Sequence, residues 1–66
     1  MNNVTYICQS IKNGAELRVS TSTNHYMCTI VERHTSAYVQ GEEVLVTKPN
    51  GRVSVWSVRG NLKKII

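Results

Sequence analysis

The chain has 66 residues, eight lysines and arginines against four glutamates with no aspartate, and a net charge of +4. This length excludes a multidomain protein, so we expect residues 1–66 to form a single domain with a small core. The basic balance favours a polyanionic partner such as nucleic acid. Domains of this size usually need a disulfide, a metal ion or a partner subunit, and two cysteines allow one internal disulfide at most. We therefore expect the chain to form a homo-oligomer, in the simplest case a homodimer.

The N-terminal sequence MNNVTYICQS has no basic leader and no long apolar run, which predicts that it is not a signal peptide. Fully apolar runs along the whole chain contain three residues or fewer, far too few to cross a membrane. We therefore expect a cytoplasmic protein with reduced thiols and no membrane partner.

The composition favours strands over helices. Valine occurs nine times, isoleucine five, threonine six, tyrosine three and tryptophan once, so 24 of 66 residues belong to types enriched in sheets. No segment has a sustained apolar period of about 3.6 residues. These features predict an all-β fold.

The first turn expected along the chain is Asn13–Gly14. Asn-Gly suits a type I′ turn, because both central residues of that turn need a positive φ. A two-residue loop there pairs Ser10 with Leu17 and Cys8 with Val19. One face of this hairpin is then apolar and the other largely polar, which is typical of a half-buried antiparallel pair.

The next two segments predict a strand and an irregular connection. Residues 21–24 indicate a turn, and residues 25–33 are apolar on both faces, which predicts a strand at the centre of a sheet or under a second layer. Residues 34–41 fit a loop, a short strand, or one helical turn near 36–40 with Ser36 as its N-cap. We favour a loop with one irregular turn.

Residues 43–58, EVLVTKPNGRVSVWSV, predict a second hairpin, for which two registers are possible. A two-residue loop at Asn50–Gly51 would put Pro49 in a pair that needs its missing N–H. We therefore predict a type I turn with Pro49 at its second position and Gly51 as a left-handed bulge residue.

This register sets the two faces of the second hairpin. It pairs Val46 with Ser54, Val44 with Trp56 and Glu42 with Val58. One face holds Val44, Val46, Trp56 and Val58, and the other holds Leu45, Thr47, Val53 and Val55. Hairpins with two apolar faces belong inside a sandwich or barrel, or under a partner chain. We accordingly predict an interface that comprises Leu45, Val53, Val55 and Trp56.

The C-terminal segment predicts a turn at Gly60 and a short apolar strand that ends at Ile66, either directly or after one 3₁₀ turn. A hairpin followed by a turn and a short closing strand resembles the end of SH3-like five-stranded barrels, over about the last 25 residues. The predicted fold is thus about five antiparallel strands in a small barrel or curled sheet of SH3-like or OB-like architecture.

The chain has residue types that bind zinc, namely Cys8, His25, Cys28 and His34. Structural zinc sites usually have two close pairs of ligands, and here Cys8 stands alone. We interpret the cysteines as small buried residues, and a Cys8–Cys28 disulfide, although both can face the core, does not fit a reducing compartment. We therefore expect no metal ion and no cofactor.

Catalytic patterns are missing from the sequence. There is no aspartate, and Glu42 and Glu43 point to opposite faces of a strand, so they cannot act as an acid–base pair. Neither cysteine lies in a glycine-rich elbow, and no phosphate-binding glycine loop is present. We expect no enzymatic activity and no small-molecule substrate.

Basic residues near aromatic residues favour nucleic-acid binding. The cations that we predict to contact phosphates are Lys48, Arg52, Arg59, Lys63 and Lys64. The tyrosines and Trp56 offer rings on which bases could stack, although large aromatic residues more often fill the core. The alternative is a protein-interaction module, an adaptor or inhibitor of the kind that phages and plasmids encode, acting through a strand edge or an apolar face.

Overall fold

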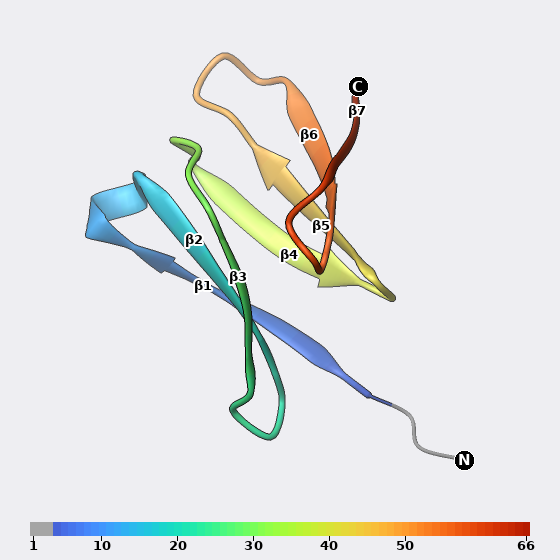
Figure 1. The fold of residues 1–66 in the computed structure, drawn as a ribbon. Coiled ribbons are helices and arrows are strands. Elements are labelled where there is room, and N and C mark those ends of the chain that lie inside the picture. The colour runs from blue at the N-terminus through green and yellow to red at the C-terminus, as the bar shows by residue number, and fades with distance from the viewer. Residues whose placement is uncertain (1–3) are drawn as a thin grey trace.

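The computed structural model describes residues 4–66, and residues 1–3 of the N-terminal segment lie outside this part. The described chain folds into seven β-strands in two antiparallel sheets (Figure 1). The strands are β1 (Tyr6–Ile11), β2 (Glu16–Thr21), β3 (Tyr26–Ile30), β4 (Ser36–Gln40), β5 (Glu43–Thr47), β6 (Val53–Ser57) and β7 (Leu62–Ile65). The first sheet has the order β1-β2-β3 and the second the order β4-β5-β6-β7.

The predicted all-β class is confirmed, with seven strands rather than about five. The sheets remain separate and are not closed into a barrel. No helix formed by residues 4–66 is long and apolar enough to cross a membrane.

The first hairpin has the predicted register. Ser10 pairs with Leu17 and Cys8 with Val19, as a loop centred on Asn13–Gly14 requires. Asn13 has φ 56° and Gly14 has φ 86°, and the amide of Ala15 donates a 3.1 Å hydrogen bond to the carbonyl of Lys12. The short loop therefore sets which residues of β1 and β2 face the core.

The second hairpin, formed by β5 and β6, also has the predicted register. Val44 pairs with Trp56 and Val46 with Ser54. Gly51 has φ 88°, and its amide donates a 2.9 Å hydrogen bond to the carbonyl of Lys48. The left-handed glycine confirms the bulged turn after Pro49.

In the middle of the chain, the favoured expectation for residues 34–41 is wrong, and one of the two alternatives for residues 25–33 is confirmed. Residues 36–40 form strand β4, not the favoured loop or a helical turn, because Ala37 and Val39 pair with β5 and pack on the core. Strand β3 lies at an edge of its sheet and not at its centre, but it does lie under the second layer, because Ile30 packs against Val44 and Val46. In β4, pairing with the next strand of the chain outweighs the local pattern.

The core lies between the two sheets. The first sheet, strand β5 and the residue that follows β6 meet in one cluster of buried residues, which are Leu17, Val19, Ile30, Val44, Val46 and Val58. None of these six is more than 3% exposed. Full burial of such a side chain contributes about 1.5–3 kcal/mol. One face of the second sheet therefore packs on the core, and its other face points away from the first sheet.

Candidate functional site

The five predicted phosphate-contacting residues fall into two groups near opposite ends of β6. Lys48 and Arg52 flank the turn from β5 to β6. Arg59 lies in the turn from β6 to β7, and Lys63 and Lys64 follow on β7. The structure therefore separates the hairpin tip from the C-terminal cations.

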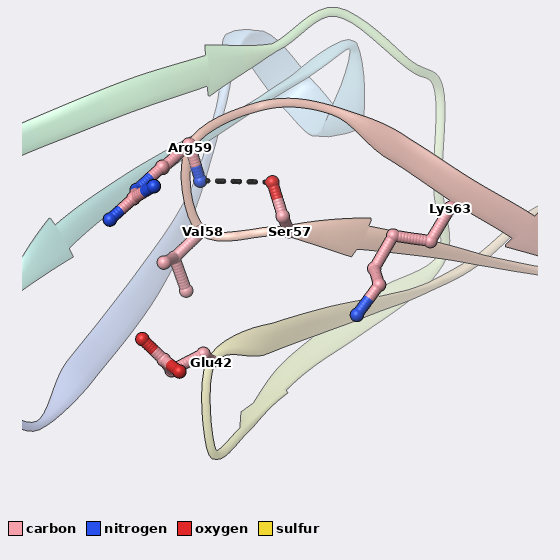
Figure 2. Close-up of a pocket in the computed structure, with 5 residues that line it drawn as sticks. All are labelled: Glu42, Ser57, Val58, Arg59 and Lys63. Atoms are coloured by element: carbon pink, nitrogen blue, oxygen red, sulfur yellow. Dashed lines mark hydrogen bonds between the residues drawn. The ribbon is translucent and has the colours of Figure 1, made fainter.

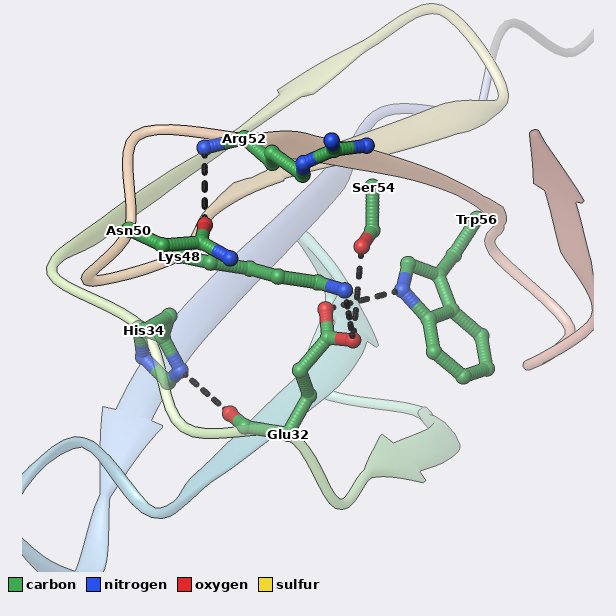
Figure 3. Close-up of polar contacts among 7 residues, drawn as sticks. All are labelled: Glu32, His34, Lys48, Asn50, Arg52, Ser54 and Trp56. Atoms are coloured by element: carbon green, nitrogen blue, oxygen red, sulfur yellow. Dashed lines mark hydrogen bonds and ion pairs between the residues drawn. The ribbon is translucent and has the colours of Figure 1, made fainter. Parts of the chain in front are cut away.

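Lys48 belongs to a polar cluster around Glu32, which follows β3 (Figure 3). The lysine Nζ lies 3.6 Å from Glu32 Oε2. The same carboxylate accepts hydrogen bonds from Ser54 Oγ at 3.3 Å and from Trp56 Nε1 at 3.4 Å. The side chains of Glu32 and Lys48 are only 19% and 23% exposed. Lys48 therefore neutralises a largely shielded carboxylate and is less available to a ligand than sequence suggests.

His34 connects the segment after Glu32 to the first hairpin through hydrogen bonds. Its Nδ1 lies 2.8 Å from the backbone oxygen of Glu32, so this nitrogen carries a proton and donates it. Its Nε2 lies 2.9 Å from Ser10 Oγ, and its amide donates a 2.9 Å hydrogen bond to the carbonyl of Gly14. Both ring nitrogens are thus engaged within the protein.

The other candidate metal ligands stay apart. Across residues 4–66, no three histidine, cysteine, aspartate or glutamate side chains converge on one point. Cys8 and Cys28 are free thiols, and Cys28 Sγ donates a 3.3 Å hydrogen bond to the carbonyl of Val58. Burial raises the pKa of the Cys8 and Cys28 thiols, which makes both poor nucleophiles at neutral pH.

Arg59 and Lys63 line a pocket between the start of β5 and the turn that follows β6 (Figure 2). Its volume is about 270 Å³, and Glu42, Ser57 and Val58 complete its wall. Ser57 Oγ accepts a 3.3 Å hydrogen bond from the amide of Arg59, which fixes the turn. The pocket therefore combines two cations with one carboxylate at the end of the second sheet.

Lys63 also makes an ion pair at the rim of this pocket. Its Nζ lies 2.6 Å from Glu43 Oε2. This hydrogen bond and the charge of Lys63 lower the pKa of the Glu43 carboxyl, so Glu43 is ionised and paired at neutral pH. The pairing leaves Glu42 as the carboxylate that faces the pocket.

The arginines differ from the lysines in their partners. The described chain has three ion pairs, Lys12–Glu16, Lys48–Glu32 and Lys63–Glu43. Lys64 and all four arginines have no carboxylate partner within residues 4–66. Arg18 instead lies over the ring of Tyr26, 5.4 Å from its centroid. Three cations of the predicted set, Arg52, Arg59 and Lys64, are therefore free to meet an anion.

Three of the four predicted interface residues share one surface. We name it the outer face of the second sheet and define it by Tyr38, Leu45, Val53, Val55, Lys64 and Ile66, which cross-strand pairing places on one side. Trp56 lies on the opposite side, where it packs against the core. No other strand among the described residues covers the outer face, since the two sheets meet through their inner faces.

The sequence indicated some of these contacts and missed others. The register that pairs Glu42 with Val58 places Glu42 beside Arg59, so the acidic wall of the pocket could have been found. The cluster around Glu32 has no local pattern, because its partners are 22 and 24 residues away in the chain. The Arg18–Tyr26 stack lies next to a register shift between Val19 and Ser20. No turn residue in the sequence predicts this shift.

Comparison of the chain with protein-family models, with curated proteins and with solved structures finds no match in any of the three.

Proposed function

We propose that this protein is a non-enzymatic nucleic-acid-binding protein whose main phosphate contacts are Arg59, Lys63 and Lys64. The observation that supports this function best is the pocket, which brings two of these cations together beside the third. Arginine suits such a site, because its planar guanidinium can donate two parallel hydrogen bonds to a phosphate. A cytoplasmic location, where the two free thiols stay reduced, is part of the proposal.

The dimensions of the pocket agree with a phosphate ligand. A volume of about 270 Å³ is many times the space of about 10–15 Å³ that a single water molecule needs on the same measure. One phosphate group and its bridging waters can therefore occupy the space between Arg59 and Lys63. Lys63 can share its ammonium between Glu43 and a phosphate, because it has three donor hydrogens.

The test is fluorescence anisotropy with labelled single- and double-stranded DNA and RNA at about 50 mM salt, repeated up to about 200 mM. Arg59→Ala should weaken binding to every bound sequence and lower the salt dependence by roughly one released ion. Glu42→Gln should strengthen binding, because it removes the one carboxylate that faces a phosphate in the pocket.

The matched control is Lys12→Ala, which also removes one positive charge but lies in the turn of the first hairpin, paired with Glu16. It should leave affinity nearly unchanged. The proposal fails if no nucleic acid binds at the lowest salt concentration. It also fails if Lys12→Ala weakens binding as much as Arg59→Ala does, since the effect then comes from net charge alone.

The second candidate function is protein binding, either to a second copy or to another protein. The specific observation in its favour is the outer face, where Leu45 and Val53 are half-buried and Ile66 is 67% exposed. Analytical ultracentrifugation of the chain and of Val53→Lys would test the homo-oligomer. A chain that is monomeric at all concentrations, and that captures no protein through this face, would rule this candidate out.

A further inference from the structure

The outer face of the second sheet places an aromatic ring and a cation in the same row. Cross-strand pairs run from Tyr38 to Leu45, from Leu45 to Val55 and from Val55 to Lys64. The row therefore crosses all four strands, with Tyr38 at one edge and Lys64 at the other. Tyr38 is 55% exposed, so much of its ring is open to solvent.

We propose that this outer face binds a single nucleic-acid strand that crosses the sheet, with its phosphates on the cations at β7 and one of its bases stacked on Tyr38 of β4. This inference rests on the proposed function, because the phosphate contacts remain Arg59, Lys63 and Lys64. It adds the strandedness of the ligand, the face that receives the bases and a residue that touches them.

The charges on this face suit a polyanion. Lys64 lies in the row of Tyr38, and the pocket with Arg59 and Lys63 opens at the end of the same sheet. Glu43 belongs to this side of β5, and Lys63 neutralises it at 2.6 Å. Of the two glutamates near β7 in the described part of the chain, only Glu42 at the pocket therefore makes no ion pair.

The shape of the face favours a single strand over a duplex. A base stacks on an aromatic ring through its flat surface, and a duplex covers that surface with neighbouring base pairs. The outer face presents side chains of four paired strands, whereas a major groove admits one helix or a two-stranded ribbon. Leu45 and Val53 offer apolar contact to further bases beside Tyr38.

A second copy of the chain fits this face less well. Val55 lies at its centre but is only 2% exposed, so it adds almost no area to an interface. Polar residues fill the flanking positions, with Ser36 paired to Thr47 and Gln40 paired to Glu43. Permanent homodimer interfaces are more continuously apolar than this mixed surface.

The experiment compares Tyr38→Ala with Tyr26→Ala, a matched control. Tyr26 is 56% exposed on the first sheet, so both variants remove an exposed tyrosine ring of similar accessibility. Binding is measured by anisotropy at about 50 mM salt, with a labelled oligothymidylate of about 12 nucleotides. The same measurement uses a duplex of equal length.

We expect the wild-type chain to bind the single strand more tightly than the duplex. Tyr38→Ala should lower single-strand affinity about 5- to 150-fold, the effect of one stacked base. Tyr38→Phe should retain the affinity because it keeps the ring, and Tyr26→Ala should leave it unchanged. Far-UV circular dichroism of each variant confirms that the sheets remain folded.

The outcomes separate this inference from the proposed function. If no oligonucleotide binds, both fail. A second outcome is that oligonucleotides bind and Arg59→Ala lowers their affinity, but Tyr38→Ala and Tyr26→Ala have the same affinity. In that case Tyr38 is not a stacking platform, and the phosphate site remains. Equal affinity for duplex and single strand overturns the single-strand assignment. A change of oligomeric state in Tyr38→Ala, with affinity unchanged, assigns the outer face to a second copy instead.

Discussion

Trp56 shows how one residue serves both packing and polar contacts. Its ring packs against the core, and its Nε1–H donates to Glu32. A partly buried tryptophan usually finds such an acceptor, because an unpaired N–H would lose its hydrogen bond to water without replacement. Trp56 is therefore an anchor between the second sheet and the segment that follows β3.

The cluster around Glu32 predicts a stability effect. Glu32→Ala should lower the free energy of unfolding by about 1–3 kcal/mol, because it leaves the hydroxyl of Ser54 buried without this acceptor and Lys48 without its counter-charge. Urea unfolding followed by circular dichroism measures this as a lower midpoint with an unchanged slope.

The control for this effect is Glu42→Ala, which removes a carboxylate that makes no ion pair within residues 4–66. Glu42 is exposed, so its removal should change the unfolding free energy by about 0.5 kcal/mol or less. Equal losses in the two variants would show that the Glu32 contacts add nothing to stability.

At the scale of strands and turns, the glycines at the hairpin tips set the registers. A Cβ on Gly51 would meet no atom within 4 Å, whereas a Cβ on Gly14 would lie 3.0 Å from the carbonyl oxygen of His34. Both positions have left-handed φ values, 88° and 86°. An added side chain would therefore strain the backbone at both glycines, but only at Gly14 would it also meet a neighbouring atom.

This difference predicts an order of stability losses. Gly51→Ala should cost about 1–2 kcal/mol from the left-handed backbone alone. Gly14→Ala should cost more, because the added methyl group also pushes against the backbone of His34. Thermal unfolding of both variants tests the order, and a larger loss in Gly51→Ala would contradict it.

The elements that sequence predicted correctly are those fixed by adjacent residues. Asn13–Gly14 and Pro49 with Gly51 determine their turns by backbone geometry, and the turns determine the registers. A short strand was one of three alternatives for residues 34–41 and was not the favoured one, because Ser36 also suits a helix N-cap and only Tyr38 and Val39 are strong strand formers. Its alternation becomes meaningful only when Ala37 and Val39 meet β5.

The candidate site was predictable only in part, for the same reason. Residue types near the C-terminus correctly indicated cations, and the structure brings Arg59 and Lys63 to one pocket. The capture of Lys48 by Glu32 depends on where the end of β3 meets the second hairpin. Such contacts between distant segments follow from the packing of the sheets and leave no local pattern.

For the molecule as a whole, the shared core couples the two sheets. Leu17 belongs to the first sheet, yet it is 1% exposed in a cluster that includes Val44 and Val46 of the second. Neither sheet can bury its apolar face alone. The sheets should therefore unfold in one transition.

Leu17→Ala tests this coupling. The substitution should lower the unfolding free energy by about 2–5 kcal/mol. The loss should appear in the fluorescence of Trp56, which lies in the other sheet. Val31→Ala, at a residue that is 75% exposed, is the control and should have little effect. A fluorescence transition that does not move in Leu17→Ala would mean that the second sheet is stable by itself.

The order of the strands has a further consequence for how the chain acquires its structure. Every hydrogen-bonded pair joins strands that are consecutive in the chain. All-β proteins often fold slowly because their pairings join distant segments, and this contact order is low by comparison. During synthesis β1 to β3 can pair as soon as they leave the ribosome. Leu17, Val19 and Ile30 then stay uncovered until β5 arrives. The interval between these events is the period when the nascent chain is most prone to aggregate.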